Sequence, residues 1–166
     1  MFDLKPLSND GVEAALKKAV RYRLLNEPFL AESICRDILA VAPDHQEALI
    51  TLILSITDQF SIAGGSTLSD ARVLLQHLTS EYDREYYAGI VCERKGKAYL
   101  HRLTAGTGPV AYDWLRQAME HYEQAEKTRP QGNDDALLRW NTCARLIQKH
   151  PHVRPGEHSH VPHLLE

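Results

Sequence analysis

The sequence predicts an all-α protein of about seven helices. Between the glycine and proline residues that break the chain into segments, apolar residues recur at steps of three and four, as one face of a helix requires. No segment shows the sustained two-residue alternation of a half-buried strand. With 166 residues and 43% apolar composition, the chain is long enough for one domain with a buried core.

The helix boundaries follow from residues that favour the first turn of a helix or stop one. Pro28 fits a first turn, because its missing amide hydrogen would have no partner there, whereas Pro43 and Pro130 end the segments before them. Glycine-containing stretches at 61–66 and 104–109 read as loops. The predicted helices cover 11–24, 28–42, 44–59, 69–78, 83–103, 110–128 and 133–149.

One spacing of residues recurs three times along the chain. A small residue is followed four and seven positions later by apolar residues, and twelve positions later by a helix stop. The three sets are Ala31, Cys35, Ile38 and Pro43; Ala71, Leu75, Leu78 and Asp83; and Ala118, Tyr122, Ala125 and Pro130. The small residue would let a neighbouring helix come close, and the stop would turn the chain into the next unit.

The segment 31–49, and also Ala118 to Pro130, resembles the tetratricopeptide repeat (TPR) family. The resemblance implies antiparallel helix pairs stacked as a short TPR-like superhelix over 1–149, whose concave groove binds a peptide or protein segment. The last helix departs from the family pattern at Arg139 and Cys143, and we expect it to cap the stack. Residues 150–166 are expected to form a flexible tail rich in histidine and proline.

The resemblance also implies which positions line the groove. They are Glu13, Leu16, Val20, Arg23 and Leu24 in the first helix, Glu47, Ile50, Leu54, Thr57 and Asp58 in the third, and Asp134, Leu137, Asn141, Ala144 and Arg145 in the last. An apolar floor with scattered charges suits an extended or helical peptide. The alternative interpretation is that Leu16, Ile50 and Leu54 only fill space between close helices.

Composition and charge argue against several other classes of function. The formal charge of −3 is too mild for bulk attraction to nucleic acid or to a membrane, so neither is expected as a partner. Arg94, Lys95, Lys97 and Arg102, interleaved with tyrosines, are interpreted as a hydrated helix face. Three cysteines far apart, with an N-terminus unlike a signal peptide, predict a cytoplasmic protein with packed, reduced thiols. No cofactor is expected, since no phosphate-binding motif is found.

The function that the sequence favours is a non-catalytic protein-interaction module, an adaptor or scaffold, whose partner is another protein or a second copy of this chain. Two alternatives stay open. The first is a metal-handling protein, because five of the nine histidines lie in the last 17 residues, with His158, His160 and His163 as weak candidate ligands. The second is a small all-helical enzyme, although no acid–base pair stands out in the sequence.

Overall fold

The computed structural model describes residues 2–62, 67–101 and 106–156, which form seven α-helices and one short 3-10 helix. These residues contain no strand, so the all-α prediction is confirmed for this part of the chain. None of their helices is both long enough and apolar enough to cross a lipid bilayer. The elements are η1 (Asn9–Gly11), α1 (Val12–Leu24), α2 (Pro28–Val41), α3 (Gln46–Asp58), α4 (Leu68–Leu75), α5 (Glu81–Leu100), α6 (Thr107–Lys127) and α7 (Asp135–Lys149).

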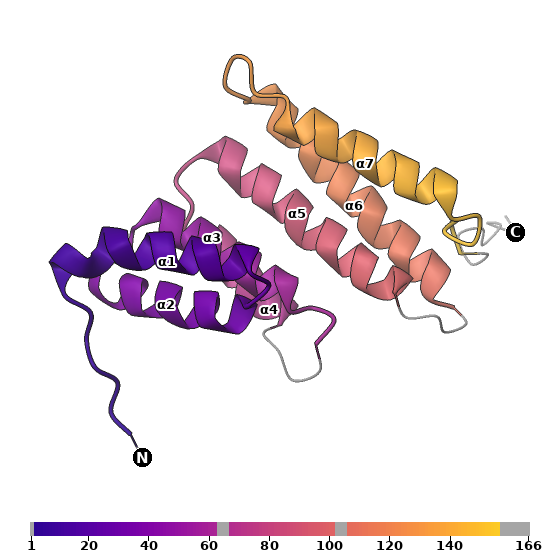
Figure 1. Ribbon diagram of the computed structural model, residues 1–166. Helices are drawn as coiled ribbons and strands as arrows, with labels where there is room; N and C mark the ends of the chain where they lie inside the picture. Colours follow the sequence, from indigo (N-terminus) through magenta and orange to yellow (C-terminus); the bar gives the residue numbers. More distant parts are fainter. Residues whose placement is uncertain (1, 63–66, 102–105, 157–166) are drawn as a thin grey trace, which may run out of the picture.

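The helices pack largely in chain order (Figure 1). Helix α1 lies against α2, α2 against α3, and α3 against α4, while α5 pairs with α6 and α6 contacts α7. Odd-numbered helices also meet one another, because α1 contacts α3 and α3 contacts α5. In Figure 1, α1 and α2 run antiparallel, as do α5 and α6. We call the surface formed by α1, α3, α5 and α7 the odd-helix face.

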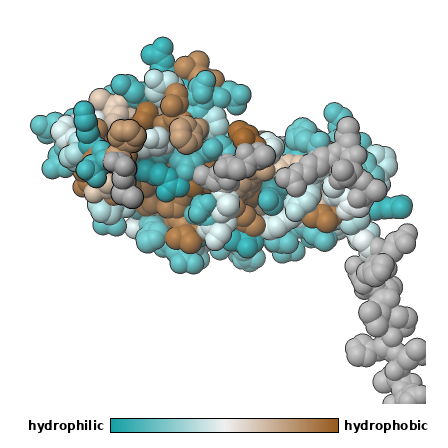
Figure 2. Space-filling view, turned by 90° about the horizontal axis from the view of Figure 1, so that it is seen from below, coloured by the Kyte–Doolittle hydropathy of each residue, from teal (hydrophilic) through white to brown (hydrophobic). Residues whose placement is uncertain are grey.

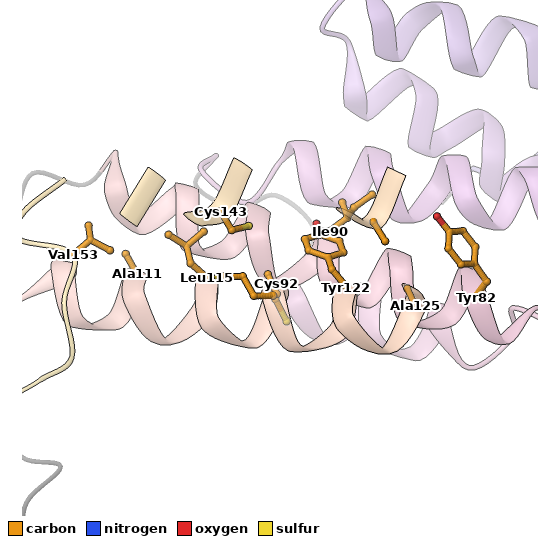
Figure 3. Packing of buried hydrophobic residues seen from close by; sticks show 12 residues of the cluster. Tyr82, Ile90, Cys92, Ala111, Leu115, Tyr122, Ala125, Cys143 and Val153 are labelled. Atoms are coloured by element: carbon orange, nitrogen blue, oxygen red, sulfur yellow. The ribbon is translucent and has the colours of Figure 1, made fainter. Parts of the chain in front are cut away.

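Two hydrophobic cores meet on α5. Ile90 and Cys92 belong to a C-terminal core shared with α6 and α7, whereas Val91 and Ala98 belong to an N-terminal core shared with α1 to α4. Figure 3 shows the C-terminal core, in which Tyr122 of α6 lies beside Ile90. Helix α5 therefore joins the two halves of the molecule.

The repeated spacing marks the buried side of the even-numbered helices. Its three small residues, Ala31, Ala71 and Ala118, are each 0% exposed. The apolar residues that follow them are buried as well, apart from Leu75, which is partly buried. The interpretation of these positions as close-packing sites is confirmed.

Several helix ends differ from the predicted ones. Helix α4 ends at Leu75 rather than at residue 78, and α5 begins after Ser80, whose hydroxyl accepts a hydrogen bond from the amide of Asp83 at 3.1 Å. Helix α6 begins at Thr107, ahead of Pro109, because amides in a first turn have no acceptor within the helix and a proline is tolerated there. The 3-10 helix before α1 has no counterpart in the predicted pattern.

The segment after α7 packs back onto the domain as far as the structure describes it. Val153 is 3% exposed and belongs to the C-terminal core, where it lies beside Ala111 in Figure 3. The carbonyl oxygen of His152 would be 2.2 Å from a Cβ on Gly108. The folded domain therefore extends at least to Val153, past the boundary expected at 149. The remainder of the expected tail, 157–166, lies outside the described residues.

Apolar side chains are exposed at the turn between α1 and α2. Leu24, Leu25 and Phe29 are 78%, 61% and 69% exposed. Figure 2 views the molecule from below and shows most of the apolar surface on this side over the half formed by α1 to α4. On the side seen there, the N-terminal half thus offers more apolar contact area than the C-terminal half.

Candidate functional site: a charged pocket on the odd-helix face

Ion pairs cross the odd-helix face between α1, α3 and α5. Asp58, the last residue of α3, pairs with Arg23 of α1, whose Nε lies 2.7 Å from Oδ2, and with Arg94 of α5 through its other oxygen. The three side chains are partly buried, between 17% and 26% exposed. One carboxylate is therefore shared by two guanidinium groups from two other helices.

A second carboxylate, that of Glu93 on α5, is fully buried near this face. The Tyr122 hydroxyl donates to Oε2 at 2.6 Å, Lys97 pairs with Oε1, and Arg139 of α7 donates to Oε1 at 3.2 Å. Burial alone would raise the pKa of Glu93, but the hydrogen bonds from Lys97 and Tyr122 and the charges of Lys97 and Arg139 bring the pKa below its ordinary value. Glu93 is therefore ionised at neutral pH and links α5, α6 and α7.

The negative charge of Glu93 shifts the pKa of two of its partners, Arg139 and Tyr122. Burial by itself would lower the pKa of Arg139, yet the carboxylate of Glu93 raises it above the ordinary value. Burial raises the pKa of Tyr122, and the neighbouring Glu93 raises it further. At neutral pH Arg139 is thus a cation, and Tyr122 keeps the proton with which it donates to Glu93.

A pocket of about 270 Å³ lies where these two ion-pair centres meet. Three of the lining side chains are cations at neutral pH, and the lining contains one carboxylate. The lining residues come from α3, the segment after it, α5 and α7: Thr57, Asp58, Phe60, Ser61, Arg94, Lys97, Ala98, His101 and Arg139. The pocket is therefore a positively charged depression supplied by three odd-numbered helices.

The spacing of residues along α5 explains its large share of this pocket. Arg94, Lys97 and His101 stand at steps of three and four, so their side chains follow one side of the helix. Glu93 lies one position before Arg94 and four before Lys97, which lets it pair with Lys97 within the helix. Helix α5 thus supplies two of the three pocket cations, Arg94 and Lys97, together with the carboxylate of Glu93, while Arg139 comes from α7.

Two glycines on α5 allow α6 to come close enough to complete the site. A Cβ on Gly89 would lie 2.4 Å from the ring of Tyr122, and one on Gly96 would lie 3.1 Å from Leu115. Each glycine costs about 1 kcal/mol relative to alanine inside a helix. The close approach at Gly89 is what places Tyr122 within hydrogen-bond distance of Glu93.

The structure places a few of the predicted groove residues at this pocket. Thr57 and Asp58 line it, and Arg23 borders it through Asp58. Leu16 is 5% exposed, and Leu54 is partly buried against the C-terminal core. These two leucines therefore make the contacts expected by the alternative interpretation, in which they fill space between close helices.

The other predicted groove residues lie away from the pocket lining. Ile50 is partly buried against the N-terminal core, and Glu13 pairs with His45 at 3.5 Å. Their contact with a partner stays a prediction. Seven of these residues are exposed and three are partly buried. The exposed residues are Glu13, Val20, Leu24, Glu47, Asp134, Leu137 and Arg145, and the partly buried ones are Ile50, Asn141 and Ala144.

Sequence reasoning missed most of the pocket's charged centre. The hydrated-face interpretation is wrong for Arg94 and Lys97, whose side chains are only 26% and 32% exposed and pair with carboxylates. Lys95 does not fit the hydrated-face interpretation either, because its Nζ lies over the rings of Phe60 and Tyr99. One residue in the sequence could have indicated this charged centre. Arg139 is a cation at a position where the family pattern expects an apolar residue.

The cysteines and histidines add no second site in the described residues. All three cysteines are buried free thiols, as predicted, and burial raises the pKa of Cys35 and Cys143 to about 12 and that of Cys92 to about 11. They are therefore protonated and unreactive at neutral pH. Within 2–62, 67–101 and 106–156, no group of three or more His, Cys, Asp or Glu residues could hold a metal ion. The candidate ligands His158, His160 and His163 lie outside these ranges.

Comparisons of the chain with protein-family models, with curated proteins and with solved structures found no match. The likeness to the TPR family is therefore one of residue spacing.

Proposed function

We propose that this protein is a non-catalytic, TPR-like interaction module that binds a peptide or protein segment along the odd-helix face. In this proposal the pairs α1–α2, α3–α4 and α5–α6 are successive repeats, and α7 caps the stack. The contacts of α1 with α3 and of α3 with α5 support this arrangement, as do the fully buried Ala31, Ala71 and Ala118.

The observation that carries the proposal is the charged pocket on this face. Side chains from α3, α5 and α7 line it, and two carboxylates hold the cations in place. Donors that are already positioned lose little side-chain entropy when a ligand arrives, so such a pocket suits the anchoring of a partner segment. On α1, Val20 stands one turn before Arg23, the partner of Asp58, and Val20 and Leu24 are 42% and 78% exposed and offer apolar contact.

Val20→Glu is expected to weaken the binding of a segment along this face by about tenfold. Val20 is exposed and lies one turn before Arg23, so glutamate costs little in the free protein but must be desolvated under a bound apolar residue. The measurement uses a 12-residue peptide selected from a random display library against the full chain. Fluorescence polarisation then gives its affinity for each variant.

Val73→Glu is the matched control, because Val73 is a 56% exposed valine on the even-numbered helix α4. The proposal expects wild-type affinity for this control. An equal loss in both variants, or no loss in Val20→Glu, would remove the odd-helix face as the binding surface. Leu54→Glu is less informative, since Leu54 packs against the C-terminal core and the variant would also lose stability.

A further inference from the structure

The charges of the pocket do not balance. Each of the two carboxylates is shared by two cations and neutralises only one of them. The two groups are Asp58 with Arg23 and Arg94, and Glu93 with Lys97 and Arg139. These six side chains, all within the described part of the chain, together carry a surplus of two positive charges.

The cations that line the pocket keep N–H groups for a ligand. The two carboxylates engage Nη1 of Arg94 and Nη1 of Arg139, and Tyr86 accepts a further hydrogen bond from Arg139, whereas a guanidinium has five N–H donors. The side chains of Arg94, Lys97 and Arg139 are 26%, 32% and 33% exposed. Because these cations are partly buried, water and salt screen them less than they would on an open surface.

From this charge surplus and donor arrangement we infer that the pocket binds the phosphate monoester of a phosphoserine or phosphothreonine in the partner segment. A phosphate monoester carries a charge of about −1.5 to −2 at neutral pH, which compensates the surplus, whereas one carboxylate compensates half of it. Its three acceptor oxygens suit donors that arrive from α5 and α7. The volume of about 270 Å³ leaves room for the phosphate and the residue that carries it. The inference rests on the proposed function, because the phosphate is carried by a segment on the odd-helix face.

Three degenerate peptide libraries, identical except for a central phosphoserine, serine or glutamate, test this inference. Each library is titrated against the full chain, and the phosphoserine library is expected to bind about tenfold more tightly than the other two. Arg94→Gln and Lys97→Gln are each expected to abolish this preference, while circular dichroism checks that both variants stay helical. Arg21→Gln is the matched control, since Arg21 is an exposed arginine on α1 outside the pocket lining.

Equal binding of the three libraries, or an unchanged preference in folded Arg94→Gln and Lys97→Gln proteins, would overturn the inference. If the libraries bind equally and Val20→Glu still weakens all of them, the proposed function stands and only the phosphate inference is wrong. If phenyl phosphate binds at the pocket while none of the peptides does, both proposals are wrong. The pocket would then serve a small phosphate compound.

Discussion

Glu93→Ala is expected to lower the free energy of unfolding by about 3–5 kcal/mol. Glu93 is 0% exposed, and its removal leaves the Tyr122 hydroxyl, Lys97 and Arg139 without the acceptor they share. Two partly buried cations would then stand close together with no charge between them. Denaturant unfolding at neutral pH, followed by circular dichroism, measures the loss.

Two further variants isolate the charge of Glu93. Tyr122→Phe removes one neutral donor to the same carboxylate and is expected to cost about 1–2 kcal/mol. If Glu93→Ala costs no more than Tyr122→Phe, the ion pairs do not hold α5, α6 and α7 together. Glu93→Gln keeps the size of the side chain and supplies the pH test.

The pH dependence has a definite sign. The pKa of Glu93 lies below its ordinary value of 4.5 in the folded protein, so on acidification the unfolded chain takes up the proton first. The stabilisation is therefore complete above about pH 5 and is lost as the pH falls through the lowered pKa of the folded state. In Glu93→Gln this part of the acid-unfolding curve should be flatter than in the wild-type protein.

Gly89→Ala is expected to destabilise the protein by about 2–3 kcal/mol, although alanine is the better helix former. The new methyl group would lie 2.4 Å from the ring of Tyr122, which is itself fully buried, so α5 and α6 must move apart. Thermal unfolding and denaturant unfolding both report the change. The hydrogen bond from Tyr122 to Glu93 would be strained by the same movement.

Gly96→Ala is the control for this prediction, since it adds the same methyl group to the same helix. Its nearest neighbour would be the side chain of Leu115 at 3.1 Å, which can give way by a few tenths of an ångström. We expect a change within about 1 kcal/mol for this variant. A Gly89→Ala protein as stable as the Gly96→Ala protein would show that the α5–α6 contact is not close-packed.

Much of the fold followed from local patterns in the sequence. The three- and four-residue spacing located the seven α-helices of the described residues, and Pro28 correctly marked a first turn. The repeated small residues identified buried positions, because only a small side chain fits where two helices touch. The start of α5 was missed because Thr79, Ser80 and Asp83 are all residue types that favour a helix N-cap, and the structure selects Ser80, whose hydroxyl accepts from the amide of Asp83.

The pocket was harder to predict, because its interactions join distant parts of the chain. Arg94 pairs with a carboxylate 36 residues away and Arg139 with one 46 residues away, and no local pattern reveals such partners. Glu93 was missed for a second reason. A glutamate is almost never fully buried unless it is paired, so its position suggested a solvated face.

The mapping of a library-selected peptide onto the full chain by NMR tests the binding proposal most directly. If the peptide binds along the odd-helix face, backbone amide resonances near Val20, Asp58 and Lys97 shift on titration, while those of α2, α4 and α6 stay nearly unchanged. Shifts confined to the even-numbered helices would contradict the proposal.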